Sequence, residues 1–140
     1  MIVVVDTNVL LKLAAARTRS PLFASWQTRQ IDLYLSVEML AELEDVLSRP
    51  KIQKFVRPSV GKQFLKLLVE RAVFVLPAHE FPHSRDPGDD KVVATAVAAK
   101  ANYLITVDKD LYDDATLVTT LAEQGIQVVQ PGHFQTLLQR

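Results

Sequence analysis

The sequence predicts a three-layer α/β/α protein with a central parallel sheet of about five strands. Short apolar runs typical of buried strands alternate with longer stretches of helical periodicity. Strands separated by helices form βαβ units, and the strands of such units are parallel. No internal repeat, low-complexity run or long linker interrupts this order, so residues 1–140 are expected to form one domain.

Five apolar runs predict the strands. The first and fourth are continuous runs rich in branched side chains, as in strands buried on both faces, whereas the second alternates apolar with polar residues. The strands are expected at residues 2–5, 31–35, 73–76, 103–107 and 126–129.

Helices are expected in the intervals, and capping residues indicate where they begin. Ser20, followed by proline, predicts an N-cap, and Ser36 can cap the next helix. Asp89 or Asp90 opens a helix of strong helix formers that ends at Asn102. The expected helices cover residues 9–16, 21–27, 37–49, 51–56, 60–71, 90–101, 115–124 and 133–138.

The composition excludes several functions. The chain has no cysteine, which excludes disulfides, thiolate metal sites and a cysteine nucleophile. The apolar run at the N-terminus reaches Asp6 after four residues, too few for a signal peptide or a membrane span. We therefore expect a cytoplasmic protein without a membrane partner.

Acidic residues follow the predicted strands. Asp6 comes directly after residues 2–5, and Asp108 directly after residues 103–107. Ligands of open parallel sheets bind beyond the carboxyl ends of the strands, so both acids are expected at one edge. Asp90, in the first turn of its helix, is a third candidate, and the helix over residues 37–49 offers a fourth acid at the same edge.

The fourth acid is not fixed by periodicity. The apolar residues of that helix form one buried stripe, consisting of Met39, Leu40, Leu43, Val46 and Leu47. Glu42 and Glu44 flank this stripe on its two borders, each about 100° from its centre, so geometry alone does not choose between them.

Each acid alone can be a turn former or a helix cap. Together, carboxylates within a few ångströms of one another resist ionising, and a hard divalent cation relieves that repulsion. Mg²⁺ prefers oxygen ligands and takes one or two carboxylates, which suits a shared or two-metal site. The pattern therefore indicates phosphoryl chemistry.

Positive charge is concentrated in one segment although the net charge is zero. Seven basic residues lie between Ser48 and Arg71, against the single acid Glu70. A neutral protein must hold a polyanion through a local patch. The alternative is an ordinary solvated helix face. The candidate phosphate contacts are Arg49, Lys51, Lys54 and Arg57.

Four segments, in order along the whole chain, resemble the motifs of PIN-domain nucleases. They are residues 3–11 (VVVDTNVLL), 36–43 (SVEMLAEL), 90–96 (DKVVATA) and 103–111 (YLITVDKDL). In addition, residues 86–91 (DPGDDK) resemble the bacterial and archaeal members described as toxins of toxin–antitoxin systems, related to the VapC type.

This resemblance implies Mg²⁺ or Mn²⁺ dependence, endonucleolytic cleavage of single-stranded RNA, homodimerisation and, for a toxin, an antitoxin partner. It selects Glu42 over Glu44, because the second motif places the acid immediately before Leu43. The implied metal ligands are Asp6, Glu42, Asp90 and Asp108. Asn8 and Thr106 would orient them, and Asp110 would be an accessory acid.

Other readings of the same residues are weaker or remain open. A haloacid-dehalogenase-like phosphatase needs a second Asp where the chain has Asn8, and a receiver domain needs an Asp where the third strand ends at Leu76. No pair of histidines is placed for metal-free ribonuclease chemistry. A non-catalytic RNA- or protein-binding module, and a housekeeping RNA-processing nuclease, remain as alternatives.

Overall fold

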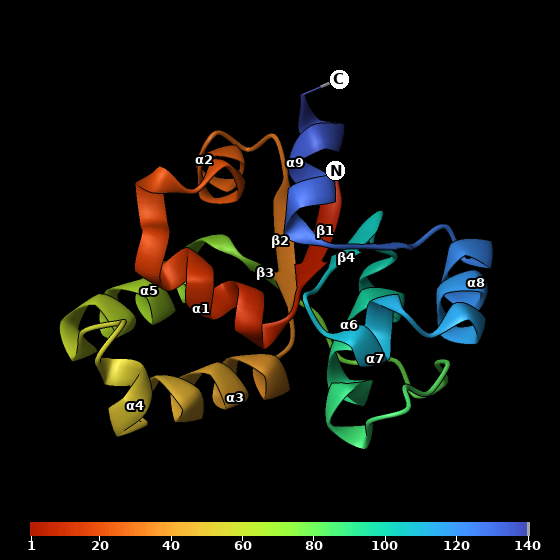
Figure 1. Cartoon of the computed structure of the whole chain (residues 1–140), viewed down its shortest axis with the longest axis horizontal. Coiled ribbons are helices and arrows are strands. Elements are labelled where there is room, and N and C mark those ends of the chain that lie inside the picture. Colours follow the sequence, from red (N-terminus) through yellow and green to blue (C-terminus); the bar gives the residue numbers. More distant parts are fainter. Residues whose placement is uncertain (140) are drawn as a thin grey trace.

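The computed structural model describes residues 1–139, and its centre is a five-stranded parallel sheet flanked by helices (Figure 1). The predicted fold class is confirmed. The strand order is β3-β2-β1-β4-β5. The strands are β1 (Ile2–Val5), β2 (Asp32–Leu35), β3 (Val73–Phe74), β4 (Tyr103–Ile105) and β5 (Gln127–Val129).

Helices cover both faces of this sheet. In Figure 1, α1 to α5 lie on the left and α6 to α8 on the right. The helices are α1 (Thr7–Ala16), α2 (Pro21–Gln27), α3 (Val37–Leu47), α4 (Pro50–Gln53), α5 (Pro58–Arg71), α6 (Asp90–Ala99), α7 (Lys109–Tyr112), α8 (Ala115–Glu123) and α9 (Pro131–Leu138), with the 3₁₀ turns η1 (Arg17–Arg19) and η2 (Pro87–Asp89). Within residues 1–139, no helix is long and apolar enough to cross a membrane.

The strand order places a topological switch point in the middle of the sheet. The chain runs outward from β1 through β2 to β3, and then returns through α6 to place β4 on the other side of β1. The connections after β1 and β4 therefore leave in opposite directions. The crevice that this opens at the carboxyl ends of the two strands is where open α/β sheets bind ligands.

The core holds these two strands in register. Val3, Val4 and Val5 are fully buried, and Val5 is paired with Ile105 of β4. Each buried aliphatic side chain of this size stabilises the fold by about 1.5–3 kcal/mol. The ends of β1 and β4 are consequently fixed relative to each other by both packing and backbone hydrogen bonds.

Several boundaries differ from those expected. The first helix begins at Thr7 rather than residue 9, because the Asp6 side chain accepts from the Thr7 N–H and caps it. β4 ends at Ile105 rather than residue 107. The sixth helix ends at Ala99 rather than 101, because Lys100 adopts the left-handed conformation with φ of 52°.

The other differences concern short elements. β3 has two residues rather than four, α3 ends at Leu47 rather than 49, and α4 ends at Gln53 rather than 56. The short helix α7 was not expected from the sequence. Its four residues directly follow Asp108, and the Asp108 side chain caps this helix. These short elements depend on local capping more than on hydrophobic periodicity.

Candidate metal centre

Asp6 lies at the end of β1 and is held by three hydrogen bonds. Its backbone N–H donates to the Ile105 carbonyl oxygen (2.9 Å), which continues the β1–β4 ladder by one residue. Its carboxylate accepts from the Thr7 N–H (2.7 Å) and from the Thr106 hydroxyl (2.9 Å). The side chain is almost buried, with 9% of the residue exposed. Strand pairing and capping together fix its position.

Thr106 connects this carboxylate to the next one. It is fully buried, and its hydroxyl oxygen accepts from the Asp108 N–H (3.0 Å) while donating to Asp6. Asp108 in turn caps α7 by accepting from the Asp110 N–H (2.9 Å). Both acids therefore cap helices and are also neighbours in one cluster. Capping a helix is thus compatible with a role of the same side chain in binding metal.

Asp89 is the third member of this cluster. It ends η2 immediately before α6. Asp6, Asp89 and Asp108 each offer an oxygen, and these three oxygens all lie within 4.8 Å of one another. The second carboxylate oxygen of Asp89 is buried and accepts no hydrogen bond from residues 1–139. Three separate segments of the chain thus bring acids to the switch point.

The electrostatics of the cluster raise the pKa values of two of its carboxylates, Asp6 and Asp89. Burial is the main cause of the raised pKa of Asp6, which the Thr106 and Thr7 hydrogen bonds oppose and the charges of Asp108 and Glu42 reinforce. The pKa of Asp89 is raised to about 7, first by burial, then by the adjacent Asp108 carboxylate and by the charges of Asp6 and Asp86.

Asp90, which the sequence analysis named as the third ligand, is not brought into the cluster. Its carboxylate accepts from the Ser84 N–H (2.9 Å) and lies 3.0 Å from His83 Nδ1. Burial, the largest effect, raises the pKa of Asp90, but the hydrogen bonds from His83 and Ser84 and the charge of His83 outweigh it and lower that pKa. The structure places Asp89 where Asp90 was expected.

The reason for this difference is geometric. Consecutive residues at a helix start point about 100° apart, so only one of two adjacent acids can face a given site. The sequence offered the pair without a means of choosing within it. The second Asp was favoured because it begins the family-like motif, whereas the orientation of η2 and the start of α6 favours the first.

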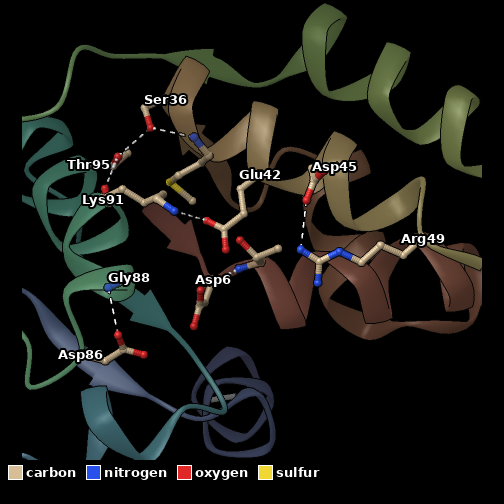
Figure 2. Close-up of polar contacts among 11 residues, drawn as sticks. Asp6, Ser36, Glu42, Asp45, Arg49, Asp86, Gly88, Lys91 and Thr95 are labelled. Carbon is tan, nitrogen blue, oxygen red and sulfur yellow. Dashed lines mark hydrogen bonds and ion pairs between the residues drawn. The ribbon is translucent and has the colours of Figure 1, made fainter. Parts of the chain in front are cut away.

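Glu42 lies beside the cluster on α3. Its carboxylate is 2.7 Å from Lys91 Nζ. Figure 2 shows that the Glu42 side chain extends from α3 toward Asp6. Its charge contributes to the raised pKa of Asp6. Glu44, the alternative that periodicity left open, is exposed to solvent. Glu42 is not among the acids of residues 1–139 whose oxygens lie within 4.8 Å of one another, so its role as a ligand stays a prediction.

A buried hydrogen-bonded chain holds α3 against α6 near Lys91. The Thr95 hydroxyl donates to the Lys91 carbonyl oxygen (2.7 Å) and lies 3.0 Å from the Ser36 hydroxyl, which caps α3 by accepting from the Met39 N–H (Figure 2). Ser36 and Thr95 are both fully buried. This contact fixes the two helices that carry the Glu42–Lys91 ion pair.

The remaining predicted site residues lie around the cluster. Asp110 belongs to a second acidic group with Asp86 and Asp89, and its carboxylate is 3.5 Å from Arg85. Asn8 is exposed in the first turn of α1. Asp89 is shared by both acidic groups, so it lies between them. Asp86, which the sequence analysis did not single out, accepts from the Gly88 N–H and caps η2.

The candidate phosphate contacts are outside the cluster and differ among themselves. Arg49 is paired with Asp45 at 2.9 Å. Lys51, Lys54 and Arg57 are exposed, and no carboxylate of residues 1–139 lies within 4.0 Å of their charged groups. Arg49 is thus already neutralised, and the other three carry free positive charge.

Comparison with known proteins identifies the family of this chain. The sequence profile of the PIN domain family matches residues 2–110, which include all the acids of the two acidic groups. The chain belongs to the PIN domain family. The crystal structure of PAE2754 from Pyrobaculum aerophilum is similar, with a TM-score of 0.60 and 15% sequence identity over 99% of this chain and 89% of that one. Comparison with curated proteins gave no match.

The cluster of this PIN domain fits a hard divalent cation. Its donors are carboxylate oxygens, which Mg²⁺ and Mn²⁺ prefer. A buried oxygen of Asp89 has no hydrogen-bond donor among residues 1–139, and burial together with the charges of neighbouring carboxylates raises the pKa values of Asp6 and Asp89. A bound cation would supply a partner for the Asp89 oxygen and favour the ionised carboxylates.

Proposed function

We propose that this PIN domain is a divalent-metal-dependent endoribonuclease that cleaves phosphodiester bonds of single-stranded RNA. The observation that carries the proposal is the convergence of Asp6, Asp89 and Asp108, from three separate segments, within 4.8 Å at the switch point of the sheet. Membership of the family supports nuclease chemistry. The single-stranded RNA substrate rests on the resemblance of the sequence motifs.

Asp6, Asp89 and Asp108 would hold Mg²⁺ or Mn²⁺, with Glu42 beside them. The bound ion would supply positive charge that makes a water nucleophilic at neutral pH and stabilises the leaving oxygen. The protein itself keeps the acids in place. The Thr106 hydroxyl and the Thr7 N–H hold Asp6, and the Asp110 N–H holds Asp108. Asp89 would lose its proton when the cation binds, because its pKa is about 7 in the absence of one.

We further propose that the protein is the cytoplasmic toxin of a toxin–antitoxin pair. Residues 1–140 would form one domain, and the protein would act as a homodimer. The support is the segment over residues 86–91, which includes Asp86 and Asp89 of the two acidic groups. A housekeeping RNA-processing nuclease would use the same centre without an antitoxin. A neighbouring gene whose product binds this chain and suppresses its activity would support the toxin over the housekeeping enzyme.

The experiment that tests the proposed activity measures cleavage of labelled single-stranded RNA and single-stranded DNA with Mn²⁺, with Mg²⁺ and with EDTA. We expect RNA cleavage that requires the cation and that EDTA abolishes. RNA binding without metal-dependent cleavage would contradict the proposal and favour a non-catalytic binding module. A preparation of the Asp108→Asn variant controls for contaminating nucleases, because it should remain folded and lose the activity.

A further inference from the structure

An apolar groove of about 500 Å³ is lined in part by residues that are close in sequence to Asp6 and Asp108. It lies between α1, which contributes Asn8 and Leu11, and the segment of α4 and its following turn, which contributes Ile52 and Phe55. A volume of this size is typical of pockets that bind small organic groups. None of the acids of the cluster lines it.

One end of the groove adjoins the cluster. Asn8 lies two residues after Asp6, and Val107, another lining residue, immediately precedes Asp108. The groove and the metal centre thus share the chain segments that follow β1 and β4, which supports binding of one nucleic-acid strand at both.

Phe55 stands at the side of the groove with 78% of its surface exposed, which is unusual for a large aromatic residue. Its backbone is nevertheless fixed. The N–H groups of Phe55 and Val56 both donate to the Ile52 carbonyl oxygen (2.9 Å each), and Val56 is buried in the core. An exposed ring on a fixed backbone is the arrangement on which bases of single-stranded nucleic acids stack.

The surroundings of Phe55 are positively charged. Lys51, Lys54 and Arg57 flank it in sequence, and Lys12 lines the groove from α1. All four are exposed, and no carboxylate of the described residues lies within 4.0 Å of their charged groups. The combination of an exposed aromatic ring with unpaired cations suits a base and its neighbouring phosphates.

We propose that this groove binds a nucleotide of single-stranded RNA adjacent to the phosphate at the metal centre, with its base stacked on Phe55 and its flanking phosphates beside Lys51, Lys54 and Arg57. The inference rests on the proposed function for the identity of the substrate. Two copies of the chain facing each other through this groove would bring the same unpaired cations together, which disfavours a symmetric protein contact here. Stacking makes the site tolerant of base identity.

The test measures the Kd of a short fluorescent oligouridylate in EDTA, where no cleavage can occur. The Phe55→Ala variant should bind at least about fivefold more weakly, the loss expected for one stacked base. The matched control is Leu76→Ala, which removes an apolar side chain that is 86% exposed and does not line the groove. The control should bind like the wild type.

A second variant separates stacking from loss of fold. Phe55→Trp should retain binding, and the fluorescence of its indole should be quenched when the oligouridylate binds. The buried Trp26 should contribute a constant signal.

The variant in which Lys51, Lys54 and Arg57 are all replaced by Gln tests the cations. Its salt dependence of log Kd should be flatter by up to about two units. An unchanged slope would overturn the assignment of these cations.

The groove and the nuclease can fail separately. Equal binding by the wild type and by Phe55→Ala would overturn the groove even if Mn²⁺-dependent cleavage is observed. Phe55-dependent binding in EDTA without any Mn²⁺-dependent cleavage would support the groove and overturn the nuclease. A change from dimer to monomer in Phe55→Ala, with RNA binding intact, would show that the groove is a protein interface and would overturn the proposal.

Discussion

The acids at the strand ends and the acids at the start of α6 are positioned in different ways. Asp6 continues a strand ladder, and Asp6 and Asp108 are linked through the buried Thr106. Asp89 and Asp90 are reached through the long connection after β3, and only one of the two can face the cluster. The continued β1–β4 ladder fixes Asp6 by register, whereas a helix start fixes a side chain by a rotation of about 100° per residue.

Neutralising Asp89 and Asp90 one at a time should give the largest difference between two variants. Asp89→Asn should lower metal-dependent cleavage by about 100-fold or more, because it removes a charged oxygen at the centre. Asp90→Asn should keep the activity within about threefold, since its carboxylate is committed to Ser84 and His83. Single-turnover cleavage rates with saturating Mn²⁺ measure both effects.

The reverse result would show that Asp90 turns toward the cluster when metal is present. Circular dichroism of both variants controls for folding. Neither substitution changes the size of the side chain, so a loss of activity by a folded Asp89→Asn variant is an effect of charge.

The second prediction tests the strand side through Thr106. Thr106→Val keeps the shape of the side chain but removes the donor to Asp6 and the acceptor for the Asp108 N–H. Removing a group that orients metal ligands typically costs about 10- to 100-fold in metal affinity or activity. Isothermal titration with Mn²⁺ measures this loss. Thr120→Val, which removes an exposed hydroxyl bonded only within α8, is the matched control and should have no effect.

The third prediction concerns α3. Glu42→Gln should lower Mn²⁺-dependent cleavage by about tenfold, because it removes a charge beside Asp6 and releases Lys91. Glu44→Gln, at an exposed position of the same helix, should retain nearly all activity. If Glu44 were the more sensitive position, the assignment of this helix face to the metal centre would be wrong.

The smallest effect is a dependence of stability on pH in the metal-free protein. The folded pKa of Asp89 is about 7 and that of Asp6 is also raised, so the folded state binds more protons than the unfolded state between about pH 4 and pH 7. The stability that these groups contribute is therefore complete below about pH 4 and is lost as pH rises through about 7. Urea unfolding in EDTA at several pH values should show this fall.

The Asp89→Asn variant gives the reference for that measurement, because it lacks the main titrating group and its stability should change less over the same range. Saturating Mn²⁺ should also reduce the fall in the wild type. A wild type and variant with parallel pH profiles would contradict the raised pKa of Asp89.

The order of the elements and two of the acids could be predicted from the sequence because they depend on hydrophobic pattern. Because Asp6 directly follows a buried strand, the sequence places it at the carboxyl end of that strand. The parallel arrangement of the strands brings Asp108 to the same edge of the sheet. The orientation of Glu42 needed the resemblance to the family, since periodicity allowed Glu44 equally well. Its position beside Asp6 and Lys91 then came from the structure.

The choice between Asp89 and Asp90 and the presence of the groove could not be predicted, because they depend on local backbone conformation and on packing between distant segments. The conformation of η2 and of the long connection before it orients Asp89 toward the cluster. The Asp86 side chain stabilises that conformation because it caps η2. The groove beside Phe55 arises from packing between α1 and the end of α4, which are far apart in sequence. Neither a repeat nor a periodic pattern marks such contacts.

We propose above all that Asp6, Asp89 and Asp108 together hold a divalent cation at the switch point of the sheet. A crystal structure of the protein with Mn²⁺, in which anomalous scattering locates the ion, tests it most directly. We predict a peak within coordination distance of these three carboxylates, with Asp90 still hydrogen-bonded to Ser84. A peak coordinated by Asp90 instead of Asp89, or no peak in this cluster at saturating Mn²⁺, would contradict the account.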